Sequence, residues 1–256
     1  MIVVSIDGAC RRNGKPDCIS AGAVFVQLLD DNGNLKATEL RSDYETKSTN
    51  QRGELLALIN ALQYAIESGQ DTLVVTDSEY LFNSMTKNWY VSWMKKGWTT
   101  ASGDEVKNKD MWTEIYKLML KVPEEQLIQF YHIKGHLVTI GTVTANRLLN
   151  ADLSGRNLYN AVCKNYDTQV ITKEKQVLDI QECSMKNNGF ALPTNQLKRF
   201  ACMNTVADRA ATRVVDMADA MHQSRGKAID NDTAESAAAP ATKSTMPVVE
   251  ALNYLA

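Results

Sequence analysis

Three acidic side chains stand at positions where a metal-binding cluster could form. Asp7 and Asp77 each follow a short apolar run that predicts a buried strand, and Glu54 lies in the first turns of a predicted amphipathic helix. Functional sites in open α/β sheets gather at the carboxyl ends of parallel strands, where Asp7 and Asp77 would converge if their strands are neighbours. Taken singly, each acid is better explained as a cap or turn residue. Three converging carboxylates would repel one another unless cations lay between them, and hard oxygen ligands favour Mg²⁺ or Mn²⁺.

The elements that would position these acids predict a mixed α/β fold. Apolar runs predict strands over 2–6, 21–29, 35–44, 73–76 and 126–133, and apolar spacing predicts helices over 51–68, 78–85 and 110–120. Asn32-Gly33 is a strong hairpin signal because both residues tolerate positive φ, and Gly69 is a natural helix stop. Three strands in hairpin order, followed by alternating helices and strands, predict a five-stranded sheet with antiparallel and then parallel strands, flanked by helices.

Composition excludes several classes of protein. The 256 residues are 44% hydrophobic and 23% charged, which is typical of a globular chain and excludes a wholly disordered or fibrous protein. The net charge of −2 gives no global sign of a nucleic-acid partner. Five cysteines without a Cys-x-x-Cys pair predict reduced thiols and no zinc site. Because no apolar stretch is long enough to span a bilayer and no signal peptide is recognisable, we expect a cytoplasmic protein without a membrane partner, in the host cytoplasm if the source is viral.

The pattern changes twice along the chain. Residues 1–136 are dense in regular pattern, whereas residues 137–203 mix polar segments with short apolar runs and show no repeat. A helical pattern returns over 203–222. From residue 223 to 256 the composition shifts to Ala, Ser, Thr, Asp and Pro, which predicts a low-complexity, disordered tail.

Five sequence blocks resemble the type 1 ribonuclease H family. They are IDGACRRNG (6–14), TNQRGELLALINAL (49–62), VVTDSEYL (74–81), WMKKGWTTASGDEVKNKDMW (93–112) and HIKGH (132–136). Any one block could arise by chance, whereas all five in the family's order and at near-family spacing make a specific match. The resemblance implies a ribonuclease H-like fold and an endonuclease that hydrolyses the RNA strand of RNA–DNA hybrids. It implies two Mg²⁺ ions held by four carboxylates, with Mn²⁺ as a substitute, products with 5′-phosphate and 3′-hydroxyl ends, and a role in removing primers or R-loops during replication.

The catalytic residues follow from this resemblance. Asp7, Glu54 and Asp77 match three of the family's four metal ligands. His136 matches a loop histidine that would move a proton near neutral pH and help the product leave.

The fourth ligand is harder to place, because the family's Asn-x-x-x-Asp pattern follows the Lys-Gly-His motif only after a long insertion, at Asn204 to Asp208. We therefore expect a catalytic domain over 1–222 that is interrupted by an insertion at about 137–203. Asp152 is the alternative ligand, since it is closer in sequence to His136 and would need only a short loop. The asparagine four positions earlier and the alanine-rich run that follows favour Asp208.

The resemblance also implies contacts with the hybrid. Asn13, Asn50 and Glu79 match minor-groove positions, where 2′-hydroxyl groups distinguish RNA from DNA. Glu79 replaces the family's usual glutamine, so it can accept a hydrogen bond but cannot donate one. Thr49 and Asn108 match the positions that hold a phosphate of the DNA strand.

A basic segment over 87–109 resembles the family's basic protrusion. It carries five lysines against Asp104 and Glu105, a net charge of +3. Lys95 and Lys96 are expected to grip the nucleic-acid backbone, and Trp89 to stack on a deoxyribose. Trp93 and Trp112 are expected in the core. The alternative for the lysines is a solvated face.

Two other functions remain compatible with the carboxylates. A DNA-cleaving nuclease of the wider superfamily would keep the acids but lack the basic protrusion and the paired asparagines at 13 and 50. A hybrid-binding module without catalysis would lack a metal ligand. We expect a monomer whose apolar last residues, 246–255, could dock on a replication protein or form a frayed helix.

Overall fold

A mixed six-stranded sheet forms the centre of the computed structural model, which describes residues 1–170, 174–190, 192–229 and 243–244. The strand order is β5-β4-β1-β2-β3-β6. The strands are β1 (Ile2–Arg11), β2 (Ile19–Leu29), β3 (Leu35–Thr46), β4 (Thr72–Thr76), β5 (Ile128–His132) and β6 (Lys243–Ser244). The first three strands are antiparallel, β4 joins β1 in parallel and β5 joins β4 in parallel. The predicted mixed α/β sheet is therefore confirmed.

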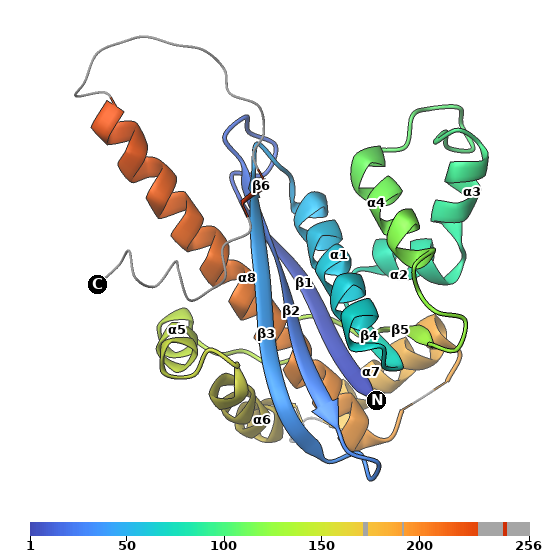
Figure 1. Cartoon of the computed structure of the whole chain (residues 1–256). Helices are drawn as coiled ribbons and strands as arrows, with labels where there is room; N and C mark the ends of the chain where they lie inside the picture. The colour runs from blue at the N-terminus through green and yellow to red at the C-terminus, as the bar shows by residue number, and fades with distance from the viewer. Residues whose placement is uncertain (171–173, 191, 230–242, 245–256) are drawn as a thin grey trace.

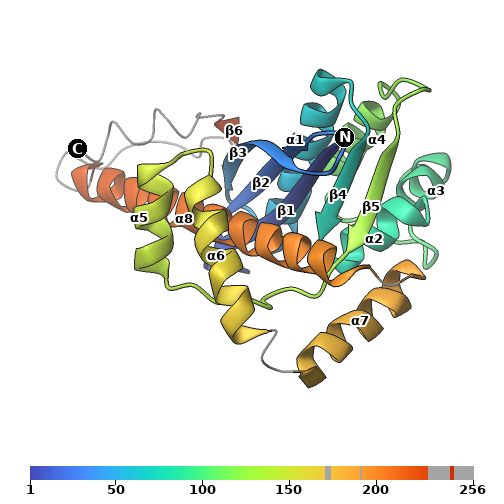
Figure 2. The same ribbon diagram turned by 90° about the horizontal axis from the view of Figure 1, so that it is seen from below.

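Helices cover both faces of this sheet (Figures 1 and 2). They are α1 (Asn50–Ser68), α2 (Glu79–Thr86), α3 (Trp89–Lys95), α4 (Lys109–Met119), α5 (Thr142–Ala151), α6 (Arg156–Gln169), α7 (Glu174–Asn188) and α8 (Thr194–Ile229). Alternate residues of β1 supply the two cores: Ile2, Val4 and Ile6 pack with α1 and α4, whereas Val3 packs with α6 and α8. No helix among the described residues could cross a membrane.

The first strand is longer than predicted, and this changes where Asp7 lies. β1 continues to Arg11 because its antiparallel pairing with β2 does, although its parallel pairing with β4 ends at Ser5. Asp7 therefore lies inside a strand, just beyond the point where the parallel neighbour stops. Asp77 directly follows β4, as predicted.

The segment at 137–203 is helical, and it is not a separate body. It forms α5, α6, α7 and the first turns of α8. Leu158 and Val162 of α6 share one hydrophobic core with Leu197 and Phe200 of α8. Helix α8 begins at Thr194 and runs without a break through residue 203, the end predicted for the insertion.

The described structure continues into the segment predicted as a tail. Helix α8 continues past residue 222 to Ile229, and residues 243–244 pair with β3 as β6. The remainder of the predicted tail, including the apolar run at 246–255, lies outside the described residues.

Candidate active site

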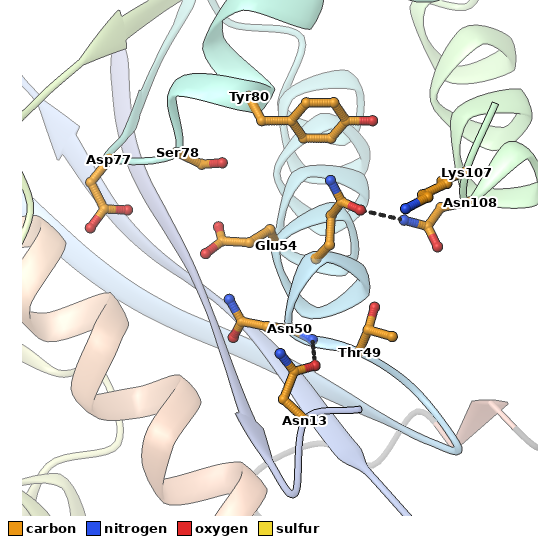
Figure 3. Close-up of a pocket in the computed structure, with 10 residues that line it drawn as sticks. Asn13, Thr49, Asn50, Glu54, Asp77, Ser78, Tyr80, Lys107 and Asn108 are labelled. Atoms are coloured by element: carbon orange, nitrogen blue, oxygen red, sulfur yellow. Dashed lines mark hydrogen bonds between the residues drawn. The ribbon is translucent and has the colours of Figure 1, made fainter. Parts of the chain in front are cut away.

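Three carboxylates from three different elements converge at one end of the sheet. Asp7 comes from β1, Glu54 from α1 and Asp77 from the end of β4, and one oxygen of each lies within 4.8 Å of the other two. Asp7 is buried and the other two are half-buried. Figure 3 shows Glu54 and Asp77 pointing into the same hollow.

Glycines bring α1 close enough to the sheet to place Glu54 there. A Cβ atom on Gly8 would lie 2.4 Å from the backbone nitrogen of Glu54, and one on Gly53 would lie 2.8 Å from the carbonyl oxygen of Ala21. Such distances are shorter than any real contact, so the helix backbone rests directly on the strands. Because Gly8 follows Asp7, this contact sets Glu54 beside Asp7.

The N-terminus of α1 is fixed by a cap and by an arginine. The Thr49 hydroxyl accepts a hydrogen bond from the backbone N–H of Arg52 (3.3 Å), as an N-cap residue does. The Arg52 guanidinium donates to Glu45 of β3 (2.7 Å) and to Asp110 of α4 (2.8 Å). These contacts join the start of α1 to β3 and to α4, and so fix the position of α1 relative to both elements.

Burial and mutual repulsion disfavour the charged forms of these acids when no cation is present. Burial raises the pKa of Asp7 well above its usual range, and the charges of Asp77, Glu54 and Asp208 raise it further. Burial, then the charge of Asp77, raises the pKa of Glu54 to about 8. The pKa of Asp77 is also raised by burial, although the nearby His136 acts in the opposite direction.

The donor set fits a divalent metal. Asp7 Oδ2 and Glu54 Oε2 are buried, and neither has a hydrogen-bond donor among the described residues. Buried carboxylate oxygens without donors are costly unless a cation satisfies them. Several carboxylate oxygens around one point are also the ligands that Mg²⁺ and Mn²⁺ prefer.

Asp208 acts electrostatically on all three of these acids, although it is not one of the three whose oxygens lie within 4.8 Å of one another. Asp208 lies in α8, and its charge raises the pKa of Asp7, Glu54 and Asp77 alike.

Asp152 instead ends α5, where its carboxylate accepts hydrogen bonds from the backbone N–H groups of Ser154 (3.1 Å) and Asn157 (2.9 Å). The Ser154 hydroxyl in turn accepts from Thr38 of β3. Strands β1 and β2 separate β3 from β4, so Asp152 belongs to another part of the fold.

The loop after β5 lies against Asp77. A Cβ atom on Gly135 would lie 2.1 Å from Asp77 Oδ2, so only glycine leaves room for this carboxylate. The next residue, His136, is exposed and has a left-handed backbone conformation with φ of 55°. His136 is thus placed near the acids, with its ring accessible to solvent.

Helix α7 supports the backbone beneath Asp77 through a second histidine. The buried His132 donates from Nε2 to the Asp77 carbonyl oxygen (3.2 Å), and its Nδ1 accepts from the Asn187 side chain (2.8 Å). The Asn188 side chain accepts from the His132 backbone N–H (2.8 Å) and donates to its carbonyl oxygen (2.9 Å). The sequence did not identify His132 as functional, because its partners lie more than fifty residues away.

A groove of about 790 Å³ opens beside the carboxylates (Figure 3). It is lined by Asn13, Thr49, Asn50, Gln51, Glu54, Asp77, Ser78, Tyr80, Lys107 and Asn108. Asn13 Oδ1 accepts from the backbone N–H of Asn50 (3.2 Å), and Asn108 donates to Gln51 (3.2 Å). Gln51, Ser78, Tyr80 and Lys107 were not singled out as site residues, although each lies within or beside a sequence block that was.

The other expected contacts lie outside this groove. Glu79 lines a neighbouring groove, and Lys95 and Lys96 are exposed at the end of α3. Trp89 is half-buried, with its ring 6.2 Å from that of Trp93.

The tryptophans expected in the core behave differently from each other. Trp112 is fully buried, as predicted. Trp93 is only partly buried and packs on Trp112 at a ring distance of 5.3 Å.

Comparisons with known proteins all find similarity to ribonucleases H. Residues 1–153 match the family described as RNase H. The Ribonuclease H of Francisella philomiragia is 36% identical over 158 residues, which cover 60% of this chain and 94% of that protein. The Ribonuclease H of Caldicellulosiruptor saccharolyticus is 33% identical over 135 residues, covering 53% and 83% respectively. The solution structure of the PFV RNase H domain is 21% identical with a TM-score of 0.44, covering 62% of this chain and 94% of that one. The family match ends before Asp208, so only the geometry bears on that residue.

Proposed function

The chain belongs to the RNase H family, and we propose that it is a ribonuclease H that cuts the RNA strand of RNA–DNA hybrids by two-metal-ion catalysis. One observation carries this proposal: carboxylates from β1, α1 and β4 converge within 4.8 Å beside a groove lined by amide side chains. A DNA-cleaving relative would need the acids but not the paired asparagines, Asn13 and Asn50, that line this groove.

Asp7, Glu54, Asp77 and Asp208 would hold two Mg²⁺ ions, or Mn²⁺ in their place. Bound there, the ions would lower the pKa of the attacking water and offset the negative charge on the phosphate and the leaving oxygen. Bound cations would offset the burial and mutual repulsion that raise the pKa of Asp7, and the close contact of α1 with β1 fixes Glu54 relative to Asp7.

The remaining residues would select and position the hybrid. Asn13 and Asn50 offer amide groups to the 2′-hydroxyls in the minor groove, which only the RNA strand carries. Thr49 and Asn108 would hold a phosphate of the DNA strand. His136, exposed next to Asp77, would take up or deliver a proton. Cleavage would leave 5′-phosphate and 3′-hydroxyl ends, suited to primer or R-loop removal in replication.

The catalytic unit that we propose includes α5 to α8. These helices share the core on one face of the sheet, and α8 carries Asp208. The segment at 137–203 is therefore an integral part of the domain.

Cleavage of labelled duplexes tests this function. With Mg²⁺ or Mn²⁺ the protein is expected to cut the RNA strand of an RNA–DNA hybrid and to leave RNA–RNA and DNA–DNA duplexes intact, and EDTA is expected to stop cutting. Asp7→Asn should abolish turnover because a neutral amide holds Mg²⁺ poorly. Circular dichroism of this variant checks that folding is unchanged. Equal cleavage of double-stranded DNA, or near-native turnover by Asp7→Asn, would overturn the proposal.

A further inference from the structure

A second groove, of about 590 Å³, lies beside the active site between α2 and α7. Its walls include Glu79, Asn83 and Lys87 on the side of α2, and Lys186, Asn187 and Phe190 on the side of α7. Glu79 directly follows Asp77 and Ser78, which line the first groove, so the two grooves meet where α2 begins.

One aromatic ring in this groove is unusually open. Phe190 is 52% exposed, although its ring packs at 5.8 Å from that of Tyr131. An aromatic ring that is anchored on one neighbour and open to solvent can stack with a nucleobase, since every base has an aromatic face.

The charges around this ring favour an anionic ligand. Lys87 and Lys186 are both exposed, and neither forms an ion pair within the part of the chain that the structure describes. The Lys87 ammonium lies 5.6 Å from the Trp89 ring. Glu79 is the acidic residue of the lining, and its carboxylate accepts a hydrogen bond from Asn83 (3.5 Å). Two unpaired lysines beside an open ring are the groups that bind a phosphate and its base in single-stranded nucleic acid.

We propose that this groove binds the single-stranded continuation of the RNA strand beyond the hybrid, an inference that rests on the proposed function. The expected DNA-strand contacts, Thr49 and Asn108, lie on the side of α1 and α4 (Figure 3). The second groove is lined by residues of α2, β5 and α7, and β5 is the edge strand next to β4, which leads to Asp77. The strand that passes over Asp77 toward Glu79 is therefore the strand that is cut. A stacked base must be free of its partner, so the bound segment is unpaired.

This assignment gives the segment at 137–203 a role in substrate choice. Helix α7 belongs to that segment and contributes Lys186, while Phe190 follows its last turn. Without α7 the groove would lack one wall, and the surface of α2 would be open to solvent.

Binding of three duplexes tests the proposal: a blunt hybrid, the same hybrid with the RNA strand extended, and the same hybrid with the DNA strand extended. Affinity is measured on the full chain by fluorescence anisotropy without divalent metal, so that the result does not depend on cleavage. The double variant Phe190→Leu with Lys186→Ala should bind the RNA-extended hybrid roughly tenfold more weakly than the wild type does, because a stacked base and a phosphate contact are lost. Its affinity for the other two duplexes should be unchanged.

Two controls separate stacking from general surface effects. Met185→Ala removes from α7 an apolar side chain with an exposure (51%) similar to that of Phe190, and it should have no effect. Phe190→Trp keeps an aromatic face and should retain wild-type affinity for the RNA-extended hybrid. An unchanged affinity of the double variant, or an equal loss on the blunt or DNA-extended hybrid, would overturn the proposal. Failure of the wild type to cut the blunt hybrid in Mg²⁺ would instead overturn the proposed function.

Discussion

Helix α1 carries Glu54 and helix α8 carries Asp208, and different contacts hold the two helices on the sheet. Helix α1 rests its backbone on β1 and β2 at Gly8 and Gly53, where no side chain fits between them. Helix α8 packs through alanine side chains, with Ala210 and Ala211 against Ala23 of β2. Its later turns are tied to β1 and the loop that follows by ion pairs, Arg11 with Asp216 and Arg12 with Asp219.

The difference shows two ways to position an acidic side chain on a helix beside the sheet. At Gly8 and Gly53 the α1 contact is backbone against backbone, so it leaves almost no room for adjustment there. The α8 contact depends on small side chains and on charges far apart in sequence, such as Arg12 and Asp219, which donate and accept at 2.8 Å. Changes on the two sides should therefore have different consequences for activity and stability.

The largest expected effect tests whether α8 supplies a ligand at all. Asp208→Asn should lower kcat by about 10²–10³-fold or more, the loss typical of removing a group that stabilises developing charge. Asp152→Asn is the matched control, and its kcat should stay within a few-fold of wild type because Asp152 lies on the β3 side of the sheet. Steady-state cleavage of a hybrid in Mg²⁺ measures both. The reverse ranking would move the fourth ligand to Asp152 and leave α8 with a structural role only.

The next prediction concerns Glu54, the buried acid on α1. The pKa of Glu54 is raised from 4.5 to about 8 in the folded, cation-free protein. A carboxyl group that binds its proton more tightly when folded stabilises the fold at pH values below about 4.5, and this contribution is lost as the pH rises through about 8. Urea unfolding in EDTA should therefore show stability falling from pH 5 to pH 8, and less so in Glu54→Gln. If Glu54→Gln shows the same fall as the wild type, Glu54 is not the group responsible.

A smaller effect on stability distinguishes the close backbone contact of α1 from the alanine packing of α8. Gly53→Ala should destabilise the protein by about 1–3 kcal/mol, because its Cβ would lie 2.8 Å from the Ala21 carbonyl oxygen and force α1 away from the sheet. Ala211→Gly on α8 should cost only about 1 kcal/mol, mainly through helix propensity. Urea unfolding measures both variants. Equal costs would show that α1 can shift outward as easily as α8.

The smallest expected effect lies outside both helices. Lys95→Ala with Lys96→Ala should weaken hybrid binding modestly and lower the slope of log affinity against log salt by close to one unit per lost phosphate contact. Lys164→Ala on α6, an exposed lysine on another helix, is the control and should leave the slope unchanged. A slope unchanged in the double variant would assign Lys95 and Lys96 to a solvated face.

The part of the fold around α1 and the β2–β3 hairpin was largely predictable, because the sequence signals for these elements are local. The hairpin at Asn32-Gly33, the stop at Gly69 and the helical spacing after Thr49 each act within a few residues, and all appear in the structure. The acids at 7, 54 and 77 were identified through the same short blocks.

The part of the fold formed by α5 to α8 was not predictable in the same way, because tertiary packing fixes these helices. Leu149, Leu158 and Tyr166 are short apolar interruptions in a polar sequence, and they become a core only when α5, α6 and α8 meet. The extension of β1 to Arg11 likewise follows from its pairing with β2, and not from its own polar residues. The hydrogen bonds that run from Asn187 through His132 to Asp77 join α7 to β5, so no local sequence pattern predicts them.

The contact between Asn188 and β5 has a consequence for solubility as well as for the site. β5 is an edge strand of the described sheet, and an unpaired edge is a template on which another chain can add a strand and start aggregation. The Asn188 side chain occupies both the N–H and the carbonyl oxygen of His132, the two groups that an incoming strand would use. Helix α7 thereby blocks intermolecular strand pairing at the end of the edge that lies beside the active site.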